Sequence, residues 1–194
     1  PVYICLVMEE IAAITPTDQT VPIQEAHKFD TTALEAFMRE NVEGFTSSLE
    51  LSQFRGGMSN PTFMVTDGGG KRYVLRKKPP GDLLPSAHAV DREFKIISAI
   101  ASTGVPVSKA YALCEDESVV GQIFYVMEFK DGRVFRGVDL PDLGAQERGE
   151  IYNNMADILA ELHEIDYAAV GLGDFGRAGG YCERQVRRWS QQYE

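Results

Sequence analysis

The sequence is poor in cysteine, in histidine and in positive charge. Its three cysteines, Cys5, Cys114 and Cys182, are odd in number and too far apart for a Cys-x-x-Cys metal site. They predict no disulfide framework and fit a reducing cytoplasm. Lys and Arg number 19 against 29 Asp and Glu, which leaves a net charge of -10. Because clustered Lys and Arg give affinity for phosphate backbones and anionic lipids, this deficit argues against nucleic acid or membrane as the main partner.

The composition nevertheless predicts a folded chain. With 44% hydrophobic and 10% aromatic residues, the chain can bury a sizeable core, and its 194 residues suit one domain with or without an appendage. The apolar run at residues 2–8 is too short to span a bilayer. Residues 1–28 begin with Pro1 rather than Met and hold two prolines in the polar stretch 15–24, so we interpret them as a tail or linker.

Patterned segments begin at residue 29. A short helix is predicted through Leu34, Phe37 and Met38, which recur at helical spacing behind the capping residue Asp30. The other segments are β-rich runs between turns, and amphipathic helices: strands at 49–54, 62–66, 72–76, 107–114 and 121–129, and helices at 86–101, 145–165 and around 186–193. This order predicts an α+β fold in which a small antiparallel five-stranded lobe with one helix precedes a helical lobe.

The turn between the first two predicted strands is rich in glycine. It contains Gly56, Gly57, Met58, Ser59 and Asn60. Glycines let a backbone approach a ligand closely, and free N–H groups with a Ser hydroxyl can surround phosphate oxygens. An ordinary flexible hairpin loop explains the same residues, so the turn alone leaves both interpretations open.

The third predicted strand combines a small apolar residue with a cation. Because side chains alternate along a strand, Val74 and Arg76 share one face, where Val74 can pack a base and Arg76 can hold phosphates. Five of the 19 cations lie within residues 71–78. The alternative is a solvated sheet edge, which we accept for Lys77 and Lys78 and leave open for Arg76.

Glu93 lies on the apolar side of the second predicted helix. It follows Val90 by three residues and precedes Ile97 by four. A carboxylate on that side is costly unless it is paired, and Arg76 is the best candidate partner. The alternative is a surface Glu with cations beside it. A Gly-rich hairpin, a strand cation and a helix carboxylate, in that order, form the phosphate-holding device of kinases.

The last predicted strand ends at a break in the chain. It runs through Met127, Glu128 and Phe129 into Lys130-Asp131-Gly132. Where a chain crosses between two lobes, its backbone N–H and C=O groups can meet the edge of an adenine. A simple buried strand is the alternative.

At these residues the sequence resembles the aminoglycoside phosphotransferase family of small-molecule kinases, which share the protein-kinase-like fold. The likeness is to the branch related to the kinase-like domain fused to some acyl-CoA dehydrogenases. It extends from about residue 29 to the end, and the matching segments are 56–63, 73–81, 84–94, 124–128, 132–133, 159–163 and 181–193.

The resemblance implies that the chain binds ATP, with Mg²⁺ bridging the phosphates. ATP would lie under residues 56–60. Arg76 would take the place of the strand lysine that steadies the phosphates, and Glu93 would hold Arg76. Met127 would guard the adenine pocket, and the hinge would consist of Glu128, Phe129 and Lys130.

The departure from the family pattern concerns catalysis. Family members carry a His-Gly-Asp loop with a downstream Asn, and later an Asp that binds magnesium. The three histidines here, His27, His88 and His163, do not precede Gly-Asp. We therefore expect the catalytic and metal-binding residues to lie outside this chain, and predict none within it.

Two short motifs imitate other sites. Asp174-Phe175-Gly176 is similar to the metal-binding tripeptide of protein kinases, but it follows the long helix too closely, so we interpret it as a loop. Gly171-x-Gly173-x-x-Gly176 imitates a dinucleotide-binding turn, although a true one needs a βαβ unit and a later acidic residue. An oxidoreductase built on that turn is a third hypothesis.

The expected function is an ATP-dependent phosphotransferase in the cytoplasm that acts on a small-molecule hydroxyl, aminoglycoside-like or hydroxyacyl-CoA-like. A non-catalytic nucleotide-binding or interaction module is the alternative. The expected organisation is a tail at 1–28, a nucleotide-binding lobe at 29–130 and the beginning of a helical lobe at 131–194. If the helical lobe is truncated, its apolar faces lose their cover and the chain should be marginally stable or self-associate. Those faces contain Leu159, Leu162, Val186 and Trp189.

Overall fold

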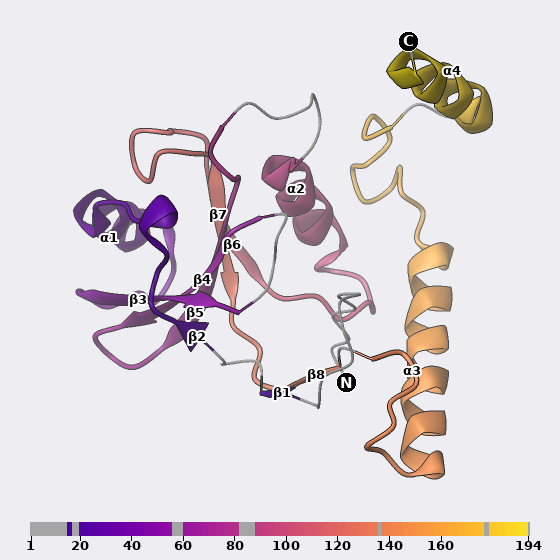
Figure 1. Cartoon of the computed structure of the whole chain (residues 1–194), viewed down its shortest axis with the longest axis horizontal. Helices are drawn as coiled ribbons and strands as arrows, with labels where there is room; N and C mark the ends of the chain where they lie inside the picture. Colours follow the sequence, from indigo (N-terminus) through magenta and orange to yellow (C-terminus); the bar gives the residue numbers. More distant parts are fainter. Residues whose placement is uncertain are drawn as a thin grey trace. The chain divides into compact units, whose positions relative to one another are not determined.

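A six-stranded antiparallel sheet organises the larger of two compact units in the computed structural model (Figure 1). The units are residues 1–164 and 165–194. The structure describes residues 15–16, 20–55, 60–81, 88–135, 137–176 and 179–193. Across the sheet the strands follow the order β2-β3-β4-β5-β7-β6. Their bounds are β2 (Thr20–Val21), β3 (Leu49–Phe54), β4 (Thr62–Asp67), β5 (Arg72–Lys77), β6 (Ala110–Cys114) and β7 (Phe124–Glu128).

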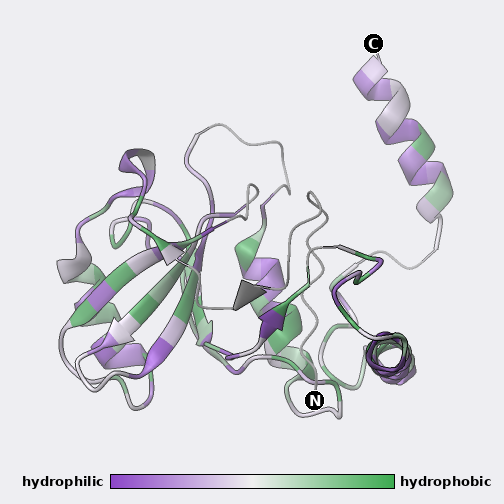
Figure 2. Cartoon of the chain, turned by 60° about the horizontal axis from the view of Figure 1, so that its bottom comes forward, coloured by the Kyte–Doolittle hydropathy of each residue, from purple (hydrophilic) through white to green (hydrophobic). Residues whose placement is uncertain are grey.

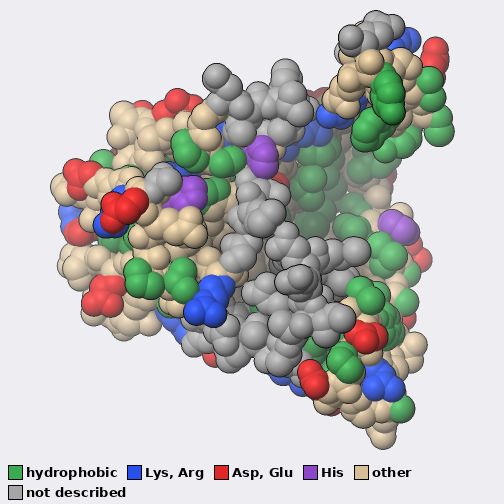
Figure 3. Space-filling model, viewed as in Figure 1, with side chains coloured by type: hydrophobic (Ala, Val, Ile, Leu, Met, Phe, Trp, Pro, Cys, Tyr) green, Lys and Arg blue, Asp and Glu red, His purple; other side chains and the backbone are tan. Residues whose placement is uncertain are grey.

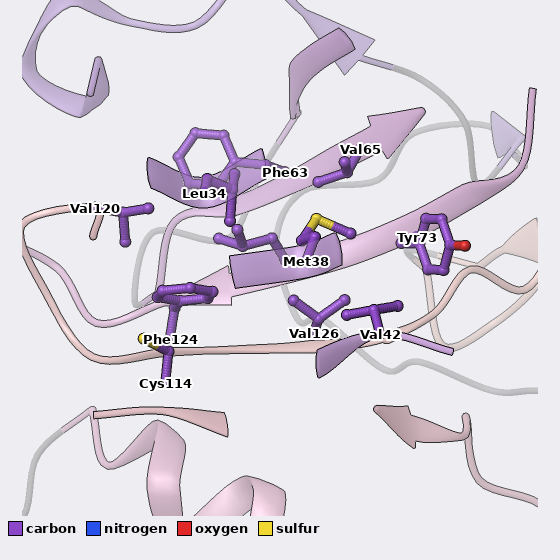
Figure 4. Close-up of a cluster of buried hydrophobic side chains, with 11 residues drawn as sticks. Leu34, Met38, Val42, Phe63, Val65, Tyr73, Cys114, Val120, Phe124 and Val126 are labelled. Carbon is purple, nitrogen blue, oxygen red and sulfur yellow. The ribbon is translucent and has the colours of Figure 1, made fainter. Parts of the chain in front are cut away.

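Helix α1 (Thr31–Asn41) covers one face of this sheet. The Asp30 carboxylate caps it by accepting a hydrogen bond from the Thr32 N–H at 2.9 Å. Leu34 and Met38, one turn apart, are fully buried against the central strands (Figure 4). The resulting core consists of Leu34, Met38, Val42, Phe63, Val65, Tyr73, Leu75, Cys114, Val120, Phe124 and Val126.

Helix α2 (Val90–Ile100) packs on the opposite face, against β6 and β7 (Figure 1). The ring of Phe94 contacts that of Tyr125, with centroids 5.9 Å apart. The helix begins at Val90 rather than at the predicted residue 86. His88 has a φ of 57°, outside the right-handed helical region, so the helix cannot continue back through it.

The α+β fold class is confirmed, but the sheet has one strand more than predicted. β2 pairs with β3, Ile23 packs against the core, and the Gln24 N–H donates to Gln53 Oε1 at 3.1 Å. The linker interpretation of residues 15–24 is therefore wrong for β2. A two-residue strand is too short to show alternation, and at a sheet edge a neighbouring proline is tolerated. A short 3₁₀ helix, Glu25–His27, follows.

The other predicted elements form with small changes in their bounds. β3 has the predicted bounds, and β4 and β5 each extend one residue further than predicted. β6 and β7 each begin three residues later than predicted, at Ala110 and Phe124. The edge strand β6 pairs with β7 through a register shift between Ala110 and Ala112.

Lys77 is buried, so the prediction that it lies at a solvated sheet edge is wrong. β5 lies between β4 and β7 and has no free edge. Lys77 shares the core-facing side of the strand with Leu75, and only 4% of it is exposed. Its Nζ donates to the Val120 carbonyl at 3.2 Å and lies 4.8 Å from the Phe29 ring centroid. Lys78, on the alternate side, remains partly exposed.

A second, smaller core lies at the start of the long helix α3 (Ala145–Glu164). Ile151 is buried there with Phe135, Leu140 and Leu143. Nearby, β1 (Thr15–Pro16) pairs with β8 (Arg133–Val134) in a two-stranded sheet. Further along α3, apolar side chains reach the surface (Figure 3), where Leu159 is 49% and Leu162 is 40% exposed.

The second unit contains helix α4 (Tyr181–Tyr193). Hydrophilic residues predominate along this helix, with a few hydrophobic ones between them (Figure 2). The apolar residues Val186 and Trp189, three positions apart, are 67% and 64% exposed. In the described parts of the chain, no helix combines the length and the apolar character that a membrane crossing requires.

Candidate functional site

Arg76 and Glu93 form an ion pair between β5 and α2. The Arg76 Nε donates to Glu93 Oε2 at 2.6 Å, and Nη2 donates to Oε1 at 3.3 Å. One edge of the guanidinium therefore faces both carboxylate oxygens, a geometry that adds direction to the attraction of charge. The side chains are 29% and 35% exposed, which leaves the pair partly accessible to solvent. The pair that the sequence predicts thus forms.

Glu93 accepts two further hydrogen bonds from neutral side chains. Asn60 Nδ2 donates to Oε1 at 3.1 Å, and the Tyr125 hydroxyl donates to Oε2 at 3.2 Å. Each carboxylate oxygen thus receives one bond from Arg76 and one from a buried neighbour. This arrangement satisfies a carboxylate that α2 presents to the sheet, and it fixes the plane of the carboxylate.

His88 extends this group of side chains. Its Nδ1 lies 3.0 Å from Asn60 Oδ1. Sequence reasoning missed His88 because nothing in the local pattern distinguishes it, and missed Tyr125 although alternation along β7 places Tyr125 on the same face as Met127. Tyr125 lies directly opposite Arg76 in the pairing of β5 with β7.

Val74, which is predicted to pack a base, and Met127, which is predicted to guard the adenine pocket, lie side by side. Val74 pairs with Met127 in the same ladder, and residues directly opposite each other point to the same face of a sheet. Val74 is 8% exposed. Since Tyr73 and Leu75 point into the α1 core, Val74 lies on the α2 face together with Arg76, as predicted.

The predicted hinge residues are held by their own side chains. Lys130 Nζ lies 2.6 Å from Glu128 Oε2, which also accepts from the Lys109 N–H at 3.3 Å. Burial acts to raise the pKa of Glu128, but these bonds and charges outweigh it and lower that pKa. Glu128 is therefore an anchored carboxylate at the end of β7.

Phe129 connects the predicted hinge to the strand before the Gly-rich turn. Its ring is parallel to that of Phe54, the last residue of β3, with centroids 6.3 Å apart and an interplanar angle of 8°. The Arg72 guanidinium lies over the Phe129 ring at 4.2 Å. Sequence reasoning did not identify Phe54, because its partner lies 75 positions away in the chain.

Four of the predicted ligands lie outside the described residues. They are Gly56, Gly57, Met58 and Ser59. Of the predicted Gly-rich turn, the structure describes Arg55 at its start and Asn60 and Pro61 at its end. Phosphate binding by these four residues therefore stays a prediction.

The two imitating motifs lie in the second unit, before α4. Asp174-Phe175-Gly176 falls in a loop, as predicted. The residues before Gly171 form turns, in which the Leu172 N–H donates to the Tyr167 carbonyl, rather than the strand that a dinucleotide-binding turn needs. Within the described ranges, no group of three or more His, Cys, Asp and Glu side chains could hold a metal ion.

An antiparallel sheet, a packed helix with a carboxylate bound to a strand cation, and a Gly-rich turn between two strands define a kinase-like phosphotransferase lobe. The chain belongs to the phosphotransferase enzyme family (APH), whose model matches residues 50–194. The resemblance seen in the sequence is thereby confirmed.

The chain is also similar in sequence to parts of two longer curated proteins. It is 50% identical over 183 residues to "Probable acyl-CoA dehydrogenase IBR3" of Arabidopsis thaliana, covering 91% of this chain and 22% of that protein. It is 47% identical over 182 residues to "Acyl-CoA dehydrogenase family member 11" of Mus musculus, covering 92% and 23%. The chain thus spans less than a quarter of the length of these curated relatives.

A solved structure is also similar. It is a crystal structure of a protein from Ralstonia eutropha JMP134 that is assigned to the aminoglycoside phosphotransferases. The two share 49% sequence identity with a TM-score of 0.73, over 86% of this chain and 47% of that one. The similarity extends from sequence to fold.

Proposed function

We propose that this chain is the nucleotide-binding part of an ATP-dependent phosphotransferase that acts on a small-molecule hydroxyl. Residues 29–130 would form the nucleotide-binding lobe, and residues 131–194 the beginning of a helical lobe. The observation that carries the proposal is the two-point pair between Arg76 and Glu93, whose carboxylate is bound to Asn60 at the end of the Gly-rich turn.

Arg76 supplies the positive charge that a triphosphate needs. Its Nε and Nη2 face Glu93, while Nη1 lies on the other side, 3.5 Å from Thr62 Oγ1. A guanidinium has five N–H donors in a fixed fork, so a second edge can bind phosphate oxygens while Glu93 holds the first. Glu93 then acts by orienting Arg76, and its own contact with the nucleotide is not needed.

The apolar and backbone parts of the site accompany Arg76 on the same sheet. Val74 would pack against the adenine, and Met127 beside it would border the pocket. The backbone of Glu128, Phe129 and Lys130 would bind the adenine edge. Their side chains are already engaged, by ion pairing or by ring stacking, which supports a hinge of defined conformation.

Mg²⁺ neutralises and bridges the phosphates in phosphoryl transfer. Because no described cluster of His, Cys, Asp and Glu side chains could hold a metal, we assign no metal ligand to the described part of this chain. We likewise assign no catalytic base. The role of the described residues is to bind and orient the nucleotide.

Two classes of phosphate acceptor are supported by the names of the relatives. The solved relative is assigned to the aminoglycoside phosphotransferases, and the curated relatives are named for acyl-CoA dehydrogenases. We therefore propose an aminoglycoside-like or a hydroxyacyl-CoA-like hydroxyl, phosphorylated in the cytoplasm. A non-catalytic nucleotide-binding module is the alternative, and ATP binding by the full chain without transfer to either acceptor would favour it.

Calorimetric titration with MgATP tests the proposal. Arg76→Ala should lower the affinity of the full chain for ATP about tenfold to hundredfold, the range expected for loss of a hydrogen bond to a charged group. Glu93→Ala should lower it in the same direction, because an unrestrained Arg76 loses its orientation.

The matched control is Arg39→Ala. It removes another arginine paired with a glutamate at 2.6 Å, Glu35, but on the exposed surface of α1. Its ATP affinity should equal that of the wild type. Unchanged ATP affinity in both Arg76→Ala and Glu93→Ala would overturn the proposal. Binding of NADH without binding of ATP would also overturn it and would favour a dinucleotide site at the Gly171 turn.

A further inference from the structure

Three polar side chains from separate segments form a continuous hydrogen-bonded chain behind Arg76. His88 precedes α2, Asn60 is the last residue of the Gly-rich turn, and Glu93 lies in the first turn of α2. The contacts are 3.0 Å from His88 to Asn60 and 3.1 Å from Asn60 to Glu93. Asn60 is 2% exposed, so its amide has few alternatives to these two partners.

The carboxylate fixes the direction of every bond in this chain. An ionised Glu93 can only accept, so the group of Asn60 that faces it must be the NH₂ donor. The Asn60 carbonyl oxygen then faces His88 and can only accept. His88 Nδ1 must therefore carry a proton, which in the neutral ring means the Nδ1–H tautomer rather than the Nε2–H one.

The backbone of His88 lies in the left-handed region. Its φ is 57°, a conformation that is uncommon for non-glycine residues and in which Asn, Asp and His are enriched. The surroundings must stabilise a residue held there. This conformation brings the imidazole onto Asn60, next to the first turn of α2.

We infer that His88 and Asn60 are positioning residues that orient the Glu93 carboxylate and, through it, the Arg76 guanidinium. Asn60, directly before Pro61 and β4, also ties this point of the chain to α2 through its bond to Glu93. We refer to the hydrogen-bonded side chains of His88, Asn60 and Glu93 as the orienting chain. Its existence is argued from the hydrogen bonds alone, whereas its effect on ATP affinity rests on the proposed function.

Nitrogen NMR of the full chain tests the orienting chain without any nucleotide. The protein has three histidines, and assignment of His88 by its loss in His88→Asn identifies the ring. The expected result is a protonated Nδ1 and, in the neutral ring, an unprotonated Nε2. A neutral His88 with its proton on Nε2 would overturn the inference.

Two substitutions at His88 separate the hydrogen bond from the backbone. Asparagine places its amide nitrogen near the position of Nδ1, and asparagine and glycine both tolerate the left-handed conformation. His88→Asn should therefore keep ATP affinity within about twofold of the wild type, whereas His88→Gly should lose about fivefold, the worth of one hydrogen bond. Equal affinities in these two variants would overturn the inference.

Asn60→Ala, which removes both links, should weaken ATP binding at least as much as His88→Gly does. The matched control is Asn41→Ala on α1, outside the site. Asn41 Nδ2 donates a hydrogen bond to the Phe37 carbonyl, at a distance of 2.9 Å. Asn41→Ala should leave ATP affinity unchanged. Circular dichroism checks that each variant is folded. If Asn60→Ala does not fold, the position of the proton on His88 in the wild type, measured by NMR, tests the inference instead.

The two proposals fail separately. If the wild type binds no ATP, the proposed function is wrong, and the protonation of His88 alone decides whether the orienting chain exists. If the wild type binds ATP while His88 carries its proton on Nε2, the orienting chain is wrong and the nucleotide site stands.

Discussion

Arg76 and Lys77 are neighbours in the sequence, but the sheet gives them opposite environments. Arg76 lies partly exposed beside Glu93, whereas Lys77 lies buried on the α1 side, where its partners are a carbonyl and an aromatic ring. Burial disfavours the ammonium and lowers the pKa of Lys77. The folded protein therefore binds this proton less tightly than the unfolded chain does.

Replacing Lys77 by methionine should stabilise the fold and change its pH dependence. At pH 7 we expect Lys77→Met to raise the free energy of unfolding by about 1 kcal/mol, because the buried charge is removed. The cost of that charge is complete below the folded-state pKa. It is relieved as pH rises from that value towards the unfolded pKa of about 10.4.

The wild type should therefore approach Lys77→Met in stability as pH rises within that interval. Urea unfolding of both proteins between pH 7 and pH 10 measures this convergence. A stability difference that is constant or widens with pH would show that burial does not govern Lys77.

Asp67 is a buried carboxylate at the end of β4, directly before the turn to β5. Burial acts to raise the pKa of Asp67, but hydrogen bonds from the backbone N–H groups of Thr46, Lys71 and Gly69 outweigh it, and the pKa is lowered. A carboxylate that accepts three N–H bonds stabilises the fold while it is ionised. That contribution is complete above the unfolded pKa of about 3.9 and is lost as pH falls through the lower, folded-state pKa.

Asp67→Asn should cost about 2 kcal/mol of unfolding free energy at pH 7, because the amide leaves some of these N–H groups without an acceptor. The difference between the wild type and this variant should shrink below about pH 4. Urea unfolding at pH 7 and at pH 3 measures it. An equal difference at the two pH values would contradict the role of the charge.

At the scale of elements, the same turn depends on a close approach between backbones. A Cβ added to Gly68 would lie 2.4 Å from the Ser47 carbonyl oxygen, whereas a Cβ on Gly70 would meet nothing within 4 Å. Gly70 has a φ of 81°, which asparagine tolerates.

We therefore expect Gly68→Ala to destabilise the fold by about 2 to 3 kcal/mol through overpacking. Gly70→Asn should cost less than about 1 kcal/mol. Thermal unfolding of the pair ranks them, and a larger loss in Gly70→Asn would contradict the steric explanation.

The sequence predicts elements best where its period is repeated. β3 and α3 form with the predicted bounds or within one residue of them, and α1 forms around Leu34, Phe37 and Met38, whose helical spacing predicts it. β2 could not be predicted in this way, because two residues do not establish a period. The late start of α2 depends on the backbone conformation of His88, which no propensity reveals.

The candidate site was predictable in its charged pair and not in its neutral supports. Glu93 attracts attention because a charge on an apolar helix face demands a partner, and Arg76 was the cation expected to share the adjacent sheet face. Asn60 entered the prediction only as part of a turn, and its bond to His88 depends on packing between segments distant in sequence. The prediction for Lys77 is wrong because the sequence of a strand does not show whether the strand lies at the edge or in the middle of a sheet, and β5 lies between β4 and β7.

At the scale of the whole molecule, apolar side chains of both units remain exposed. On α4, Val186 is 67% and Trp189 is 64% exposed, and the two lie three positions apart on the helix. Large exposed apolar residues that recur on one helix face favour association. We expect the chain to self-associate with increasing concentration.

Sedimentation velocity over a range of concentrations measures this association. Trp189→Glu should reduce it severalfold, while Gln191→Glu adds the same charge at an exposed polar position of α4 and should have little effect. A monomer with a sharp, concentration-independent unfolding transition would contradict the expectation.

The central claim is that Glu93 serves the nucleotide by orienting Arg76, and a double-mutant cycle in ATP affinity tests it most directly. Titration of the wild type, Arg76→Ala, Glu93→Ala and the double variant gives the coupling energy between the two residues. We predict that the double variant binds ATP as weakly as Arg76→Ala alone, with a coupling of at least about 1 kcal/mol. Losses that simply add, or no loss in any variant, would contradict the claim.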